Sequence, residues 1–252
     1  MSEDPYESTE DWGVTFRGIA DGWLFSDVVG QLPGVVVLPL ENPDLYDRTD
    51  WEKKVAIEGH HRSVSIARHR GRRFGILSAK LGAPAAAMAV EAAAARGVHT
   101  LIGMGYCGAI APEINCGDLV VPTGAVAGDG TSAAYCSERY PAVADHSLVT
   151  ALRQASGGRM HDGLVHSLDA VLTQDSALVE RCRRLRVSAI DMETSAVLTV
   201  ARLRQVRAAT VLVASDHPGR GIYTDPVMLT AGSRSAVEVV LEAVSNLAAE
   251  LD

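Results

Sequence analysis

Short apolar runs rich in β-branched residues alternate along the chain with longer segments in which apolar positions recur every three or four residues. The short runs predict buried strands, and the longer segments predict amphipathic helices. We expect strands over 34–40, 74–83, 99–105, 117–127, 162–172 and 208–217, and helices over 84–98, 145–155, 175–186, 188–202 and 230–251. This alternation predicts a three-layer α/β domain.

One strand–helix–strand unit stands out between residues 74 and 105. Its helix starts at Pro84 and ends at Gly97, which are favoured residues for a helix start and a helix end. A helical crossover between two strands implies that they pair in parallel. Because no repeat or linker divides the chain, we expect an N-terminal extension over 1–30 and a single domain over 31–252.

Composition narrows the function. A chain of 252 residues with 47% hydrophobic content can bury a sizeable core. The net charge of -8 argues against nucleic acids and membranes as partners and favours a small molecule. The four cysteines lack zinc-site spacing, so we expect no metal and interpret them as reduced thiols of a cytoplasmic protein.

The segment "GMGYCG" (103–108) has the G-x-G-x-x-G spacing of dinucleotide-binding folds, with Asp129 as a candidate ribose ligand. That motif must open a helix whose N-terminus holds the pyrophosphate. Pro112 and Gly117 follow too soon for such a helix. We therefore expect a strand end at which the backbone closely approaches a ligand.

Two acidic clusters are candidates for chemistry. In "AIDMETSAV", Asp191 and Glu193 open an apolar helix, where acids are also favoured simply by the helix dipole. In "VASDH", Asp216 ends a buried strand, and partial removal from water would let it act as a general acid. On local sequence alone, a capping or turn aspartate before Pro218 is an equally good interpretation.

Several stretches occur in a characteristic order: "KLGAPAAAMAVEAAAARGVHTLIGMGYCGAI", "GDLVVPTGAVAGDGTSAAY", "PAVAD", "AIDMETSAVLTVAR" and "VASDH". In combination they resemble the purine nucleoside phosphorylase and uridine phosphorylase family, over nearly all of 34–250. The resemblance implies a phosphorylase-like α/β fold, with a mixed central sheet flanked by helices and a ligand site at strand ends. It also implies a hexamer or dimer that shares residues between subunits, and no cofactor.

The resemblance assigns roles to the acidic clusters. Glu193 and Met192 would grip the ribose, the glutamate accepting hydrogen bonds from the 2′ and 3′ hydroxyls, and Asp191 would hold the base or the loop. Ser215 and Asp216 fit purine chemistry, in which the aspartate protonates the departing base at N7. The remaining substrate-binding candidates are Gly105, Tyr106, Cys107 and Gly108 in the glycine motif, and Val171 where the family often has a stacking aromatic residue.

The chain departs from the family where phosphate would bind. In "VLPLENPDLYDR", Leu40 and Glu41 disturb the expected glycine position, and Leu45 falls where an arginine is expected. Gly103 replaces a strand-end arginine, and Tyr106 replaces a hydroxyl residue and could fill the vacated space. Each lost charged hydrogen bond forfeits roughly 1.5 to 3 kcal/mol, so phosphate is a doubtful co-substrate.

Arg62 retains the position of an arginine lent by a neighbouring subunit. Lys80 and Arg48 could also offer positive charge, although a solvated surface charge is the favoured interpretation of each. Glu41 is a candidate general base for activating water, as in the nucleosidases of this superfamily, although an exposed loop acid is the alternative.

Two functions therefore remain. The first is an enzyme that cleaves the N-glycosidic bond of a purine-like nucleoside, by hydrolysis or a modified reaction in preference to plain phosphorolysis. The second is a repurposed scaffold that binds or transforms a nucleoside-like or natural-product ligand without cleaving that bond.

Overall fold

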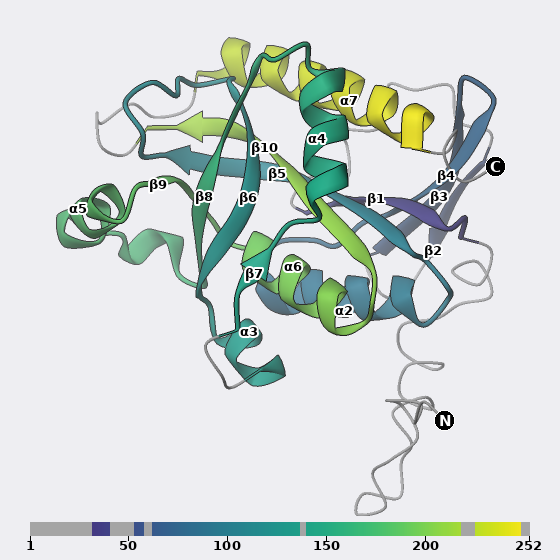
Figure 1. Cartoon of the computed structure of the whole chain (residues 1–252), viewed down its shortest axis with the longest axis horizontal. Coiled ribbons are helices and arrows are strands. Elements are labelled where there is room, and N and C mark those ends of the chain that lie inside the picture. Colours follow the sequence, from purple (N-terminus) through teal and green to yellow (C-terminus); the bar gives the residue numbers. More distant parts are fainter. Residues whose placement is uncertain (1–31, 41–52, 58–61, 137–139, 218–224, 248–252) are drawn as a thin grey trace, which may run out of the picture.

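The computed structural model describes residues 32–40, 53–57, 62–136, 140–217 and 225–247. They form a central mixed β-sheet with helices on both sides, which confirms the expected α/β class (Figure 1). The strands are β1 (Val35–Pro39), β2 (Lys53–Ile57), β3 (Arg62–His69), β4 (Arg72–Leu77), β5 (Thr100–Ala109), β6 (Leu119–Gly128), β7 (Ala142–Val143), β8 (Met160–Leu168), β9 (Val187–Asp191) and β10 (Arg207–Asp216).

The helices form two layers. Those in the described residues are α2 (Ala83–Ala94), α3 (Gly130–Tyr135), α4 (His146–Ala155), α5 (Ser176–Arg184), α6 (Thr194–Leu203) and α7 (Pro226–Leu247), with a short 3₁₀ turn over Val171–Thr173. Helices α4 and α7 pack together on one side of the sheet, and α2, α3 and α6 pack together on the other (Figure 1). Within the described part of the chain, no helix is both long enough and apolar enough to cross a membrane.

The sheet closes partly on itself. Strand β5 pairs with β10 and β9, and the path β9–β8–β6–β10 returns to β5, so these five strands form a ring. Four more strands extend from β5 in the order β1–β4–β3–β2, and β7 pairs with β6. Strand β1 pairs in parallel with both β4 and β5. The strands on either side of α2 are therefore parallel, as expected, but β1 lies between them and they do not pair directly.

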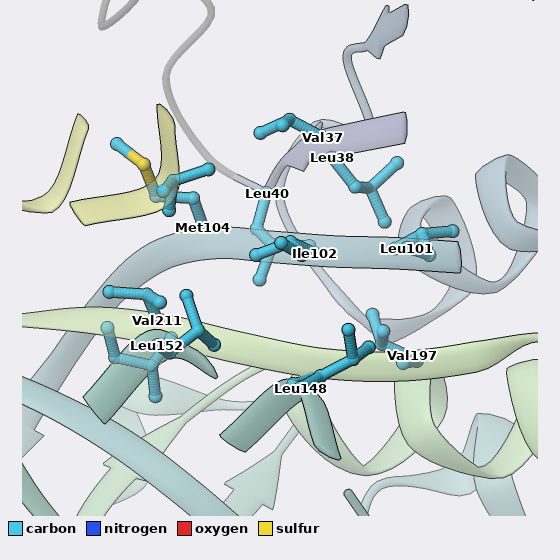
Figure 2. Packing of buried hydrophobic residues seen from close by; sticks show 14 of the residues in the cluster. Val37, Leu38, Leu40, Leu101, Ile102, Met104, Leu148, Leu152, Val197 and Val211 are labelled. Carbon is cyan, nitrogen blue, oxygen red and sulfur yellow. The ribbon is translucent and has the colours of Figure 1, made fainter. Parts of the chain in front are cut away.

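The core lies around β1 and the first half of β5. All five residues of β1 are buried, as expected for a parallel strand covered on both faces. Figure 2 shows Leu38, Leu101 and Ile102 in this core, with Leu148 and Leu152 of α4 nearby. Helix α2 packs closely on α6 because its buried face is built mainly from alanine, whose side chain is small.

Helix α2 has the expected ends: Pro84 lies in its first turn, and Gly97 follows its end with φ +78, a conformation that favours glycine. No helix follows "GMGYCG", also as expected, because β5 continues to Ala109 and a turn follows. The segment 188–202, however, is not one helix. Residues 187–191 form β9, and α6 begins at Thr194.

Candidate active site

Residues 105–107 of β5 lie between the ends of two other strands. Strand β1 pairs in parallel with β5 as far as Met104, and β9 pairs antiparallel with it from Gly108 onward. Gly108 pairs with Asp216 on β10 as well as with Ile190 on β9, so β10 occupies the opposite edge of β5. The carboxyl ends of β1 and β9 therefore approach each other beside 105–107. Ligands of α/β sheets bind at such points.

Glu193 lies between the end of β9 and the start of α6 and is 0% exposed. Its Oε1 accepts a hydrogen bond of 2.6 Å from the backbone N–H of Gly82, the residue before α2, and its Oε2 is also buried. Gly82 is the N-cap of α2, so the carboxyl group of Glu193 lies at the partially positive end of that helix. The fold thus presents a buried, oriented carboxylate beside the end of β9.

Asp191 holds the turn that leads to Glu193. Its carboxylate accepts hydrogen bonds from Ser167 Oγ on β8 (2.5 Å) and from the backbone N–H of Thr194 (2.8 Å). Ser167 Oγ in turn accepts the N–H of Ser195 at 2.9 Å. Burial raises the pKa of Asp191, although the hydrogen bonds from Ser167 and Thr194 oppose that shift. Asp191 therefore anchors the start of α6, and Met192 lies half-buried in the turn between the two acids.

The network continues to Asp129, the residue considered above as a dinucleotide ligand. Its carboxylate accepts hydrogen bonds from the hydroxyls of Ser195 and Ser132 and from the backbone N–H of Ser132. Asp129 is 4% exposed and caps α3. The carboxylate of Asp129 therefore holds α3 and α6 together. This structural role accounts for the residue, and no dinucleotide contact is needed to explain it.

Asp216 lies half-buried at the end of β10. The hydroxyl of Ser215 is 2.7 Å from Asp216 Oδ1 and 3.2 Å from the carbonyl oxygen of Cys107, and it can donate its one hydrogen to either acceptor. Cys107 is buried and belongs to the segment between the ends of β1 and β9. Asp216 and Ile190 are both register partners of Gly108, so the strands that carry Asp216 and lead to Glu193 flank the same residue.

The face of β5 that carries Gly103 and Gly105 is covered by apolar atoms. A Cβ atom at Gly103 would lie 2.7 Å from Thr210 Cγ2 and 3.6 Å from Leu40 Cδ1, and one at Gly105 would lie 3.2 Å from Leu40 Cβ. Leu40 is 0% exposed and packs against β5 beyond the end of β1 (Figure 2). An arginine at position 103 has no room in this packing.

Tyr106 differs from its expected placement. Its hydroxyl is 3.4 Å from Ser233 Oγ on α7, so the ring extends toward the helix layer opposite α2 and α6. The space beside Gly103 and Gly105 is instead taken by Leu40 and Thr210.

The other predicted residues lie on other elements or outside the described residues. Val171 is 45% exposed in the short 3₁₀ turn after β8. Arg62 begins β3, where its backbone pairs with Ile57 of β2. Lys80 is half-buried with φ +73, an uncommon conformation for a lysine. Glu41 and Arg48 lie outside the described residues.

Three residues of the candidate site carry no clear signal in the sequence. Gly82 contributes its backbone N–H to Glu193, and the sequence gives no sign of this because the donor is not a side chain. Ser167 binds Asp191 across the β8–β9 pair, and only the register of those strands reveals it. Thr210 occupies the middle of a strand that the sequence marks simply as buried. For Ser167, the one available signal was a hydroxyl at a strand end beside Asp169.

The chain matches the model of the phosphorylase superfamily over residues 28–251, and it belongs to that family. The guanosine phosphorylase of Halorubrum lacusprofundi is 31% identical over 232 residues, which cover 86% of this chain and 95% of that protein. The uridine phosphorylase of Thermococcus kodakarensis is 30% identical over 238 residues, covering 87% and 84% respectively.

Solved structures agree. The uridine phosphorylase of Vibrio fischeri is similar with a TM-score of 0.77 at 27% identity, covering 86% of this chain and 94% of that one. The purine nucleoside phosphorylase of Toxoplasma gondii matches with a TM-score of 0.79 at 23% identity, covering 88% and 94%, a likeness of fold alone. The family resemblance and the assignment as an enzyme are thereby confirmed.

Proposed function

We propose that this enzyme cleaves the N-glycosidic bond of a purine-like nucleoside beside residues 105–107 of β5. The observation that carries the proposal is the buried carboxylate of Glu193, oriented by the N–H of Gly82 at the end of β9. Two carboxylate oxygens match two adjacent sugar hydroxyls, and their negative charge favours an oxocarbenium-like sugar. Met192, in the same turn, packs against the sugar.

Asp216 is the acid of the proposed reaction. As the bond between sugar C1′ and the base breaks, its electron pair moves into the base, and Asp216 donates a proton to the base at N7. Ser215 orients the aspartate through its hydroxyl, 2.7 Å away. The choice of a purine rests on the Ser-Asp sequence and agrees with the naming of one relative as a guanosine phosphorylase.

We further propose that water, rather than inorganic phosphate, takes the base's place on the sugar. The support is the apolar packing of Leu40 and Thr210 against Gly103 and Gly105, which leaves no room for an arginine on that face. Water then adds its hydroxyl to C1′ and gives its second proton to a general base. Glu41 is the candidate for that base, outside the described residues. The products are free base and free sugar.

Phosphorolysis is the second candidate, and the names of the relatives favour it: guanosine and uridine phosphorylases cover most of the chain. Phosphorolysis requires that phosphate is bound by groups other than a side chain at position 103. Lys80, half-buried two residues before Gly82, is one candidate cation.

Release of free base separates the two candidates. Inosine, adenosine, guanosine and a methylthio-nucleoside are incubated with the enzyme, with phosphate at millimolar concentration or removed by an enzymatic phosphate trap. We expect equal rates of base release in both conditions. A rate that falls to background in the trap establishes phosphorolysis, and no release from any nucleoside in either condition contradicts glycosidic cleavage.

A further inference from the structure

Glu193 occupies the N-cap position of α6, the residue just before the helix. An N-cap side chain ordinarily accepts the backbone N–H of the second or third helical residue, which has no carbonyl partner inside the helix. Glu193 makes no such bond, and its Oε1 instead accepts the N–H of Gly82. Other groups must therefore accept the N–H groups in the first turn of α6.

Ser167, on β8, makes the capping bond in place of Glu193. Its Oγ accepts the N–H of Ser195, the second residue of α6, at 2.9 Å. This N–H is a donor that an N-cap side chain would otherwise bind. Asp191 accepts the N–H of Thr194, the first residue of the helix, at 2.8 Å. The start of α6 is thus capped without the side chain of Glu193.

Two contacts fix the hydroxyl of Ser167. The side chain is 0% exposed, and the parallel register of β8 and β9 pairs Ser167 with Asp191. The hydroxyl donates its one hydrogen to Asp191 Oδ1 at 2.5 Å, so its oxygen accepts the N–H of Ser195. Leaving a buried N–H without an acceptor is costly, so removal of the hydroxyl should drive Ser195 to find another acceptor.

We infer that Ser167 is a positioning residue, which keeps the Glu193 carboxyl group directed toward the sugar by capping α6 in its place. The inference rests on the proposed function, in which Glu193 binds the sugar hydroxyls. Because Ser167 is fully buried, it acts through Glu193 rather than by touching the substrate. Without its hydroxyl, the N–H of Ser195 turns to the neighbouring carboxyl group of the N-cap residue, and a Glu193 that caps its own helix no longer faces the sugar.

Inosine and 2′-deoxyinosine separate positioning from a merely structural role, because only inosine offers Glu193 a 2′-hydroxyl. Base release from both is measured with the full chain, and kcat/KM for inosine is divided by kcat/KM for 2′-deoxyinosine. We expect Ser167→Ala to lower this ratio roughly tenfold or more, the effect of losing one hydrogen bond to a charged group. Ser156→Ala is the matched control and should stay within twofold, since Ser156 is 1% exposed and its Oγ donates to the carbonyl oxygen of Arg153 at the end of α4.

Ser167→Cys tests the same bond with a smaller change. A thiol is a weaker donor and acceptor than a hydroxyl, so the ratio should lie between those of the wild type and Ser167→Ala. Circular dichroism identifies the folded variants, and Ser167→Cys decides if Ser167→Ala does not fold. A wild-type ratio in the folded variants, even with a general loss of rate, overturns the inference and leaves the proposed function intact. A wild-type enzyme without any preference for inosine removes the sugar-binding role of Glu193, and this inference with it.

Discussion

The two strand ends that meet beside residues 105–107, those of β9 and β1, differ in the polarity of their buried side chains. At the β9 end, Glu193 and Asp191 are buried carboxylates held by backbone N–H groups and hydroxyls. At the β1 end, Leu40 is equally buried but presents hydrocarbon to Gly103 and Gly105. In the proposed function the β9 end holds the sugar, while the adjoining face beside Leu40 is filled by apolar packing.

The two ends also differ in how they are stabilised. A buried polar group is tolerated only when its hydrogen bonds are made, so the β9 end depends on a connected network that runs from Asp191 through Ser167 and Ser195 to Asp129. The β1 end depends on close packing, where small changes in volume are costly. The polar end should therefore respond to changes of charge, and the apolar end to changes of size.

The largest expected effect on the rate comes from changing Asp216, the proposed acid, which pairs with Gly108. Asp216→Asn removes the proposed proton donor while keeping the side-chain shape, and we expect the rate of base release to fall by about 10²- to 10⁴-fold. Steady-state kinetics on inosine would measure it. Asp162→Asn, a change of an exposed aspartate paired with Arg153, is the control and should stay within twofold. An unchanged rate in Asp216→Asn would exclude this residue as the acid.

Glu193→Gln comes next. The amide keeps the size of the side chain but removes the charge that favours an oxocarbenium-like sugar, and we expect kcat/KM to fall by about 10²-fold, the effect of losing roughly one to two charged hydrogen bonds. Circular dichroism checks that the variant is folded. Glu180→Gln, at an exposed position of α5, should leave kcat/KM unchanged. Equal values for both variants would remove the sugar-binding role.

Gly103→Ala tests the apolar end. The new Cβ would lie 2.7 Å from Thr210 Cγ2. Thr210 cannot easily move, because its side chain is β-branched and its Oγ1 is hydrogen-bonded to Thr194 Oγ1 at 3.2 Å. We expect a loss of about 1 to 3 kcal/mol in the free energy of unfolding, measured with urea. In Gly130→Ala the new Cβ makes an ordinary contact of 3.5 Å, and the change should cost less than about 0.5 kcal/mol. Equal costs would show that the face is not tightly packed.

The smallest effect concerns Asp191, whose pKa is raised by burial. Between its unfolded and folded pKa values the native state binds more protons than the unfolded state, so this group's contribution to stability decreases as pH rises through that window. The stability lost in Asp191→Asn should therefore be greater near pH 4 than near pH 8. Urea unfolding at both pH values measures the difference, and a loss that grows with pH would contradict the raised pKa.

The sequence predicted the fold better than the site. Strands such as β1 and β10 are continuous apolar runs, and Pro84 and Gly97 mark the two ends of α2. The local sequence pattern was therefore enough to predict these elements. Strand β9 was missed because five residues, Val187–Asp191, carry too little periodicity to separate them from the apolar helix that follows.

Motifs in the sequence led to Glu193 and Asp216 as candidates, and their site roles remain predictions. The hydrogen-bond partners that are distant in sequence were missed. The N–H of Gly82 reaches Glu193 across 111 positions, and Ser167 reaches Asp191 across 24. The direction of Tyr106 also could not be read, because it depends on which face of β5 turns toward α7. Such contacts follow from strand register, which no local pattern encodes.

Identifying the sugar product tests the central contrast most directly. Guanosine or inosine is cleaved in the presence of millimolar phosphate, and the reaction is followed by ³¹P nuclear magnetic resonance together with detection of free ribose. If the apolar face beside Leu40 excludes phosphate, free ribose accumulates in step with the base and the phosphate signal stays constant. A sugar 1-phosphate signal that grows in step with the base would contradict this account.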